Sequence, residues 1–201
     1  RRVTEAIESG GVVGIVGPWA DDVGQAVADV ARRHKVVHYW SGGPVECNRY
    51  WFQWAPPYYT GAKAAMDYAV QKHPEGKRWY RITADYAFGW TLEELEDQFG
   101  ETHGIEWVGS SRHVLGEREF SRYMGEIMAA QPDVLVLNNF GLDTAQAIRE
   151  AVSYGLNQTT QILVPWGSGI EDYLRLDPSI TEGIIIGSAF YYTAEPARDF
   201  S

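Results

Sequence analysis

The chain of 201 residues is 45% hydrophobic, and its 17 Lys and Arg residues against 27 Asp and Glu give a formal net charge of −10 at pH 7. This length and apolar content are enough for a buried core in one large or two modest domains. The negative charge, with no basic stripe to offset it, argues against a nucleic-acid partner. No apolar run approaches the roughly 20 residues of a membrane-spanning helix, so we expect no direct membrane insertion.

The start of the chain and its cysteine content bear on compartment. The first residues, RRVTEAIESGG, resemble neither a signal peptide nor an initiating methionine, and we expect an interior piece of a longer protein. Cys47 is the single cysteine, which argues against a disulfide or a thiolate metal site within the chain. A partner for Cys47 could lie outside the chain, so the compartment does not follow from it.

Strand-like and helix-like patterns alternate along the chain. Apolar runs rich in β-branched and aromatic residues predict eight strands, at 12–16, 36–40, 50–54, 79–83, 105–109, 133–137, 161–165 and 183–187. Apolar residues at helical spacing predict four buried helix faces, made of Val23, Ala26, Val27 and Val30; Ala62, Ala65, Met66 and Ala69; Phe120, Met124, Ile127 and Met128; and Ala145, Ile148 and Val152. Asp22 and Thr60 are the predicted N-caps of the first two helices.

This alternation predicts a doubly wound α/β protein. Strands that alternate with helices form right-handed crossovers and a mostly parallel sheet with both faces covered. The Gly- and Pro-containing segment 41–59 interrupts the alternation and predicts a crossing between two lobes. Residues 57–187 supply five strands, enough for a complete C-terminal lobe. Residues 1–56 supply part of an N-terminal lobe, which is therefore expected to be truncated, and residues 188–201 begin a crossing back to it.

The candidate site lies in the turns that follow the strands. In an open α/β sheet, ligands bind outside the carboxyl ends of the strands, where strand-to-helix turns and helix N-termini meet. The residues that we select in these turns are Pro18, Trp19, Ala20, Ser41, Gly42, Gly43, Tyr86, Phe88, Phe140 and Trp166. Their rings can enclose a flat or cationic organic ligand, while backbone N–H groups at 41–43 and the Ser41 hydroxyl hold a carboxylate. The alternative for a single ring, such as Phe140, is that it only plugs the sheet edge.

Other chemistries have less support. Neither of the glycine-rich nucleotide-binding motifs occurs, nor does the G-x-S-x-G motif of serine hydrolases, so we expect no cofactor. His34 and His38 fall on different predicted elements, and no metal site is expected. Gly167-Ser168-Gly169 is interpreted as a set of backbone donors for an anionic group.

No catalytic residue is predicted either. Asp85 could be a general base, but a carboxylate at a helix start is ordinarily a cap, and we favour capping. The pairs Asp21–Asp22 and Glu93–Glu94 fit solvated faces better than acid/base dyads.

Five stretches follow one another in an order that matches a known family. They are VVGIVGPWADDVGQAVADVARRHKVVHYWSGG, CNRYWFQWAPPYYTGAKAAMDY, RITADYAFGWTLEELEDQF, RHVLGEREFSRYMGEIMAAQPDVLVLNNFGLDTAQAIREAVSYGL and EGIIIGSAFYY. Together they resemble type I periplasmic substrate-binding proteins of the branched-chain amino acid and amide class, the receptors of ATP-driven (ABC) importers. The most specific part is TADYAFG combined with REF at a helix start and AFYY near the end.

The resemblance implies two α/β lobes, joined by three crossings, that close over a ligand like a hinge. It implies a receptor and not an enzyme, with a small-molecule ligand, the membrane permease of an ABC importer as partner, a monomeric state, and a periplasmic or lipid-anchored extracellular location. In such proteins the turns at 18–20 and 41–43 hold the ligand carboxylate, and an aromatic residue at the position of Phe88 covers the ligand, with further contacts at Phe140.

One position departs from the family pattern. Amino-acid binders usually place an acidic residue for the ligand ammonium where this sequence has Trp166. Without it, a branched-chain amino acid would bury a poorly paired ammonium at a cost of several kcal/mol, of which a cation–π contact returns only about 0.5–2 kcal/mol. We therefore predict an aromatic carboxylate, an amide or a quaternary ammonium compound ahead of leucine. The competing hypotheses are a ligand-sensing domain of a regulator or receptor, and an enzyme with Asp85 or His113 as base.

Overall fold

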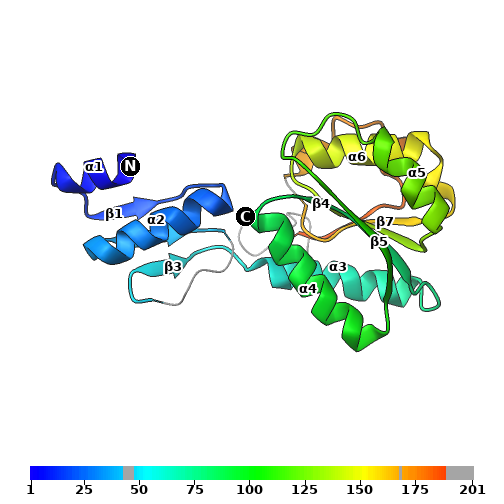
Figure 1. Cartoon of the computed structure of the whole chain (residues 1–201), viewed down its shortest axis with the longest axis horizontal. Coiled ribbons are helices and arrows are strands. Elements are labelled where there is room, and N and C mark those ends of the chain that lie inside the picture. Colours follow the sequence, from blue (N-terminus) through cyan, green and yellow to red (C-terminus); the bar gives the residue numbers. More distant parts are fainter. Residues whose placement is uncertain (43–47, 168, 189–201) are drawn as a thin grey trace, which may run out of the picture. The chain divides into compact units, whose positions relative to one another are not determined.

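The computed structural model describes residues 1–42, 48–167 and 169–188. The chain divides into two compact units, an N-terminal unit of residues 1–57 and a C-terminal unit of residues 58–201 (Figure 1). Gly43, Cys47 and Ser168 lie outside the described residues, as does almost all of the expected second crossing at 188–201.

The N-terminal unit is built on a three-stranded parallel sheet. Its elements are α1 (Arg2–Glu8), β1 (Gly14–Val16), α2 (Asp21–His34), β2 (Val37–Trp40) and β3 (Trp51–Gln53). The strand order is β1-β2-β3. All three predicted strands are therefore present, each shorter than its apolar run. Helix α1 has no counterpart among the predicted elements.

The core of this unit is organised around Trp40. Its indole is fully buried, and a methyl group on Gly24 of α2 would come 2.1 Å from the ring atom Cζ2. Because only a glycine leaves room for the ring, α2 meets the sheet through the face that carries Gly24, Val27, Ala28 and Ala31. Of the predicted face only Val27 is buried, whereas Val23 is 52% exposed and Ala26 is exposed.

The C-terminal unit contains a complete doubly wound sheet. Its elements are α3 (Tyr58–Lys72), β4 (Arg78–Ala84), α4 (Ala87–His103), β5 (Glu106–His113), α5 (Ser121–Ala130), β6 (Val134–Asn138), α6 (Leu142–Ser153), the 3₁₀ helix η1 (Leu156–Gln158), β7 (Gln161–Val164), α7 (Ile170–Tyr173), α8 (Pro178–Thr181) and β8 (Ile185–Ile186). The five strands are parallel in the order β5-β4-β6-β7-β8. Helices α3 and α4 cover one face of the sheet, and α5 and α6 cover the other (Figure 1).

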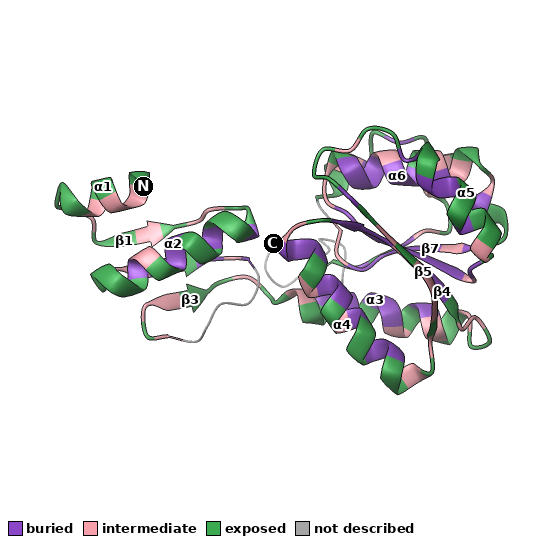
Figure 2. Cartoon of the chain, viewed as in Figure 1, coloured by how far each residue is buried: buried purple, intermediate pink, exposed green. Residues whose placement is uncertain are grey.

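Two apolar cores fill this unit, one on each face of the sheet. Figure 2 shows buried residues along the strands and on the inner sides of the helices. The predicted inner face of α3 is confirmed, because Ala62, Ala65, Met66 and Ala69 are all buried. The predicted face of α5 is confirmed except for Met128, which is half exposed. In α6, Ala145 and Ile148 are buried and Val152 is partly buried.

The helix starts differ from the predicted caps. Helix α2 begins at Asp21 with Ala20 as N-cap, and helix α3 begins at Tyr58, so Asp22 and Thr60 both lie inside the first turn. The predicted caps are wrong because the backbone turns into the helix earlier than the apolar pattern indicates. Such boundaries depend on where the preceding strand or crossing ends.

Candidate functional site

Five aromatic rings meet at the carboxyl edge of the C-terminal sheet. We call this group the aromatic cluster, and its members are Tyr58, Tyr86, Phe88, Phe140 and Trp166. The ring centroids of Tyr58 and Phe88 are 5.1 Å apart, those of Phe88 and Phe140 5.6 Å, and those of Tyr86 and Phe88 5.8 Å. Trp166 contacts Tyr58, with the two ring centroids 5.2 Å apart. The separations are those that aromatic pairs prefer, and every pair except Tyr86–Phe88, which is tilted, meets edge to face.

The cluster joins the four aromatic candidates of the C-terminal unit. Tyr86 and Phe88 follow β4, Phe140 follows β6 and Trp166 follows β7, so the parallel strands deliver them to one edge. Phe88 lies at the centre and is 3% exposed, whereas the other four rings remain partly exposed. Phe88 is thus packed among its neighbours in the chain, and any ligand contact would be made chiefly by the rings around it.

Tyr58 is the member that the sequence analysis missed. It is the first residue of α3, and α3 runs opposite to the strands, so its N-terminus reaches the carboxyl edge. The sequence offered one signal, because Tyr58 directly follows Pro56-Pro57, and proline is enriched at helix starts. The side chain was overlooked because it follows no strand.

The turn after β7 has a structural role that differs from the prediction. The backbone N–H of Gly167 donates to the carbonyl oxygen of Gly187 at 2.8 Å, and that of Gly187 donates to Val164 at 2.8 Å. The Gly167 N–H is therefore used within the sheet and is not available to an anion. Of the remaining predicted donors, Ser168 lies outside the described residues, and Gly169 is the N-cap of α7.

In the N-terminal unit, the turns after β1 and β2 lie side by side. Trp19 is 71% exposed, and Ala20 is the N-cap of α2. Ser41 is partly exposed and Gly42 is buried, and a methyl group on Gly42 would come 2.4 Å from the Asp21 carboxylate oxygen Oδ1. The structure thus places the candidates of the two turns at one edge of this sheet. Pro18 follows a cis peptide bond, and Gly43 is not among the described residues.

Asp21 changes the electrostatics expected at this edge. It was predicted to lie on a solvated face with Asp22, but it is 2% exposed, and only Asp22 faces solvent. Its position in the first turn of α2 is one that the helix dipole favours. The buried Asp21 carboxylate therefore belongs to the packing of α2 against the turn at Gly42.

Asp85 does not cap α4 and takes part in a charged network instead. Tyr86 is the N-cap, and the Asp85 carboxylate accepts a hydrogen bond from the Trp90 indole at 2.9 Å. Arg112 lies 3.4 Å from Asp85 and 2.5 Å from Glu93. Glu93 is buried, so its prediction as part of a solvated pair is wrong, and the reason is that Arg112 on the neighbouring β5 neutralises it.

A second carboxyl group lies deeper, between α4 and the sheet. Glu96 is fully buried and accepts a hydrogen bond from Asn138 Nδ2 at 3.0 Å, with Arg81 at 3.5 Å. Burial raises the pKa of Glu96 from 4.5 to about 8, and the nearby charge of Glu93 adds to the rise, while Asn138 and Arg81 act in the opposite direction. The group is therefore an uncharged acid at neutral pH.

The neighbouring residue, Asn139, is also buried. Within the part of the chain that the structure describes, neither its amide nitrogen nor its amide oxygen has a hydrogen-bond partner. Buried amides are nearly always paired. The Asn139 amide therefore has an unused donor and an unused acceptor, next in sequence to Phe140 of the aromatic cluster.

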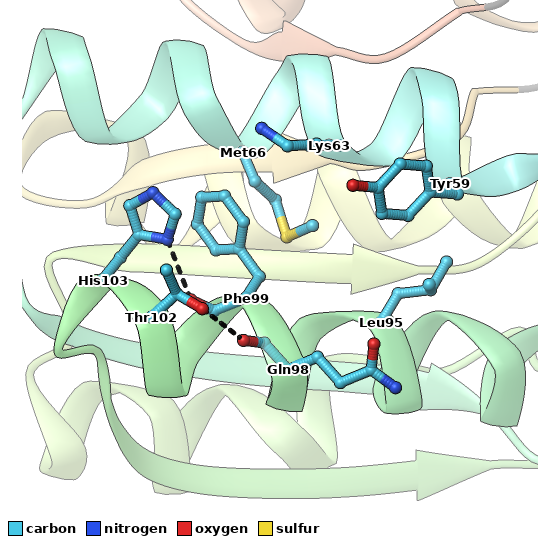
Figure 3. A pocket seen from close by; sticks show the side chains of 8 residues that line it. All are labelled: Tyr59, Lys63, Met66, Leu95, Gln98, Phe99, Thr102 and His103. Carbon is cyan, nitrogen blue, oxygen red and sulfur yellow. Dashed lines mark hydrogen bonds between the residues drawn. The ribbon is translucent and has the colours of Figure 1, made fainter.

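A separate groove runs between α3 and α4. Its volume is about 320 Å³, and Met66, Phe99 and Leu95 supply apolar walls (Figure 3). Lys63 at its rim is paired with Asp67 at 2.5 Å, and the His103 ring stacks on Phe99 at 3.9 Å. The rim groups already satisfy one another, and none of the predicted ligand-binding residues lines this groove.

The buried histidines of the chain take part in structural contacts. Over residues 1–42, 48–167 and 169–188, no group of three or more His, Cys, Asp or Glu side chains is arranged to hold a metal ion. His38 and His113 are buried and contact backbone carbonyl oxygens at 2.6 and 2.8 Å. Over the same residues, no helix has both the length and the apolar character needed to cross a membrane.

Comparison with protein families gives one decisive match. The model of the family described as "Periplasmic binding protein" matches residues 1–201, which is the whole chain. The chain belongs to the periplasmic binding protein family. This confirms the resemblance seen in the five sequence stretches, and the parallel sheets confirm the predicted fold class.

Individual relatives of this periplasmic binding protein agree with that assignment. The Leu/Ile/Val-binding protein homolog 4 of Brucella abortus is 26% identical over 168 residues, which are 77% of this chain and 40% of the relative. The structure of an amino acid ABC transporter substrate-binding protein from Pseudomonas fluorescens has a TM-score of 0.85 at 34% identity, over 99% of this chain and 55% of that one. A periplasmic binding protein from Burkholderia mallei has a TM-score of 0.87 at 27% identity, over 99% and 54%. The chain thus spans about half the length of these relatives.

Proposed function

We propose that the protein containing this chain is the extracytoplasmic solute-binding receptor of an ABC importer. In this proposal a small organic ligand binds between two lobes, the lobes close around it by a hinge motion, and a membrane permease receives it. The observation that carries the proposal is the aromatic cluster, which gathers five rings at the carboxyl edge of the sheet in a chain of the periplasmic binding protein family. Ligand favours the closed state only through contacts that differ between open and closed states.

The composition of the two edges supports a particular ligand class. The C-terminal unit offers partly exposed rings from Tyr58, Phe140 and Trp166, which suit a flat apolar body. The N-terminal unit offers the partly exposed Ser41, whose hydroxyl suits a polar head group, and Trp166 stands where amino-acid binders usually place the acid that pairs with a ligand ammonium. We therefore propose an amide, a quaternary ammonium compound or an aromatic carboxylate in preference to a branched-chain amino acid.

Titration of the full-length protein is expected to separate these classes. Benzamide, choline and benzoate represent the proposed ligands, and leucine, isoleucine and valine represent the branched-chain amino acids. We expect at least one of the first three compounds to bind more tightly than all of the amino acids in isothermal titration calorimetry. The reason is that Trp166 occupies the position where amino-acid binders usually carry the acid that pairs with the ligand ammonium. Submicromolar binding of leucine, isoleucine or valine would refute the ligand class and leave the receptor role intact.

A receptor, unlike an enzyme, should not depend on Asp85. Asp85 is half exposed and is held by Trp90 and Arg112, so its carboxylate serves a structural contact. We expect Asp85→Asn to keep the dissociation constant of the best ligand in the panel, and we expect no turnover of bound ligand by either protein in chromatographic analysis. Conversion of the ligand by the wild type that disappears in Asp85→Asn would establish the enzyme hypothesis instead.

A further inference from the structure

We propose that Gly61 is the positioning residue that sets where the indole of Trp166 stands at the ligand edge. The inference rests on the proposed function for its ligand consequence, but the contact itself is a property of the C-terminal unit. Gly61 lies in the first turn of α3, and Trp166 lies in the turn after β7, about one hundred residues later in the chain.

The two residues are in direct contact. A methyl group on Gly61 would come 2.6 Å from Cζ3 and 2.7 Å from Cε3 of the Trp166 ring. Carbon atoms in ordinary contact stand about 3.5–4.0 Å apart, so the indole rests on the bare backbone of Gly61 at van der Waals distance. Any side chain at this position occupies the space of the six-membered ring.

The backbone under the ring is closely packed against two other segments. A methyl group on Gly187 would meet the carbonyl oxygen of Gly61 at 2.8 Å and that of Pro165 at 2.0 Å, so the start of α3, the turn after β7 and the end of β8 are in close approach. The hydrogen bond from Gly167 to Gly187 fixes the same turn. Because the backbone around Gly61 is closely packed, and the nearest atoms to an added methyl group belong to the Trp166 ring, we expect that ring to be displaced.

Displacement of that ring reaches the rest of the aromatic cluster. Trp166 packs edge-on against Tyr58 at 5.2 Å, and Tyr58 packs against Phe88 at 5.1 Å. Gly61 and Tyr58 lie on the same turn of α3, so one short helical segment supports the ring from two sides. Trp166 is only partly buried, which leaves the remainder of its surface for a ligand.

The contact can be tested without any ligand. In the full-length protein with ¹³C and ¹⁵N labels, the α-protons of Gly61 are expected to show a ring-current shift that Trp166→Ala removes. Gly61→Ala is expected to move the indole Nε1–H resonance of Trp166, whereas Gly125→Ala, on an exposed position of α5 with open space around it, leaves that resonance in place. An unmoved Trp166 resonance in folded Gly61→Ala would overturn the inference.

The ligand consequence is tested by a double-mutant cycle with the tightest-binding compound among benzamide, choline and benzoate. Gly61→Ala is expected to weaken binding about tenfold, and Trp166→Ala to weaken it by a similar factor or more. In the Trp166→Ala background, Gly61→Ala should cause no further loss, since the ring that it displaces is absent. A loss that persists in that background would show that Gly61 does not act through Trp166.

The outcomes separate the inference from the proposed function. Unchanged affinity of Trp166→Ala, together with the expected resonance shifts, would remove Trp166 from the ligand site while upholding Gly61 as its support. Weakened affinity of Trp166→Ala, with unchanged affinity of Gly61→Ala, would uphold the site and overturn the inference.

Discussion

Replacement of Glu96 by glutamine is expected to abolish most of the pH dependence of stability of the C-terminal unit between pH 4.5 and 8. The free energy of unfolding of the variant should equal that of the wild type near pH 4.5 and exceed it increasingly toward pH 8. The reason is that the folded protein buries this carboxyl group completely, at the contact of α4 with the sheet, and holds it in the uncharged form.

The sign of the effect follows from proton binding. In the unfolded chain Glu96 loses its proton around its ordinary pKa of 4.5, whereas in the folded chain its pKa is about 8. Between these values the folded state binds the extra proton, so the stability of the wild type falls as pH rises, by at most about 1.4 kcal/mol per pH unit. Above pH 8 both states are ionised, and no further loss comes from this group.

Urea unfolding at a series of pH values measures this effect. The glutamine amide can still accept the hydrogen bond that Asn138 donates, so the variant keeps the local packing. Glu94→Gln is the matched control on the same helix, because Glu94 is exposed, and it should leave the slope of the wild type unchanged. A slope in Glu96→Gln as steep as in the wild type would show that Glu96 is not the titrating group.

Replacement of Gly89 by alanine is expected to destabilise the C-terminal unit by about 1–3 kcal/mol. Gly89 is buried in the first turn of α4, and a methyl group there would come 2.1 Å from the carbonyl oxygen of Ala84 and 2.7 Å from Thr83 Cγ2. The clash is with backbone at the end of β4, which the neighbouring strands hold in place. Helix α4 would have to lift off the sheet and carry Phe88 with it.

The sign of this prediction is diagnostic because helix propensity acts in the opposite direction. Alanine in a helix interior is more stable than glycine by about 0.5–1 kcal/mol when nothing clashes. Gly125→Ala provides that comparison, since its position in α5 is exposed and has open space around it, and it should stabilise. Thermal and urea unfolding of both variants measures the two effects, and a Gly89→Ala variant as stable as Gly125→Ala would contradict the close approach of α4 to β4.

The elements of the fold were accessible from local patterns. All eight predicted runs overlap strands of the structure, because burial of a parallel sheet on both faces leaves continuous apolar runs in the sequence. The buried residues of α3 also follow the predicted helical spacing. The same reasoning placed Tyr86, Phe88, Phe140 and Trp166 at one edge, since strands that run in parallel end on the same side.

The errors share a physical origin in contacts between distant residues. The inner face of α2 was misjudged because Trp40 of β2 selects the side of the helix where Gly24 leaves room. Glu93 was assigned to solvent because its partner, Arg112, is on the next strand. Asp21 was assigned to a solvated face together with Asp22, but it is buried beside the turn at Gly42.

Local patterns in the sequence were enough to give the alternation of strands and helices, the family, and the sheet edge at which aromatic side chains gather. These follow from short-range periodicity and from the geometry common to all parallel sheets. The tertiary structure alone decided that Tyr58 completes the aromatic cluster, that Gly61 supports Trp166, and that Glu96 is buried as an uncharged acid. Each of these depends on side-chain volume and on burial between elements far apart in the chain, which no local pattern records.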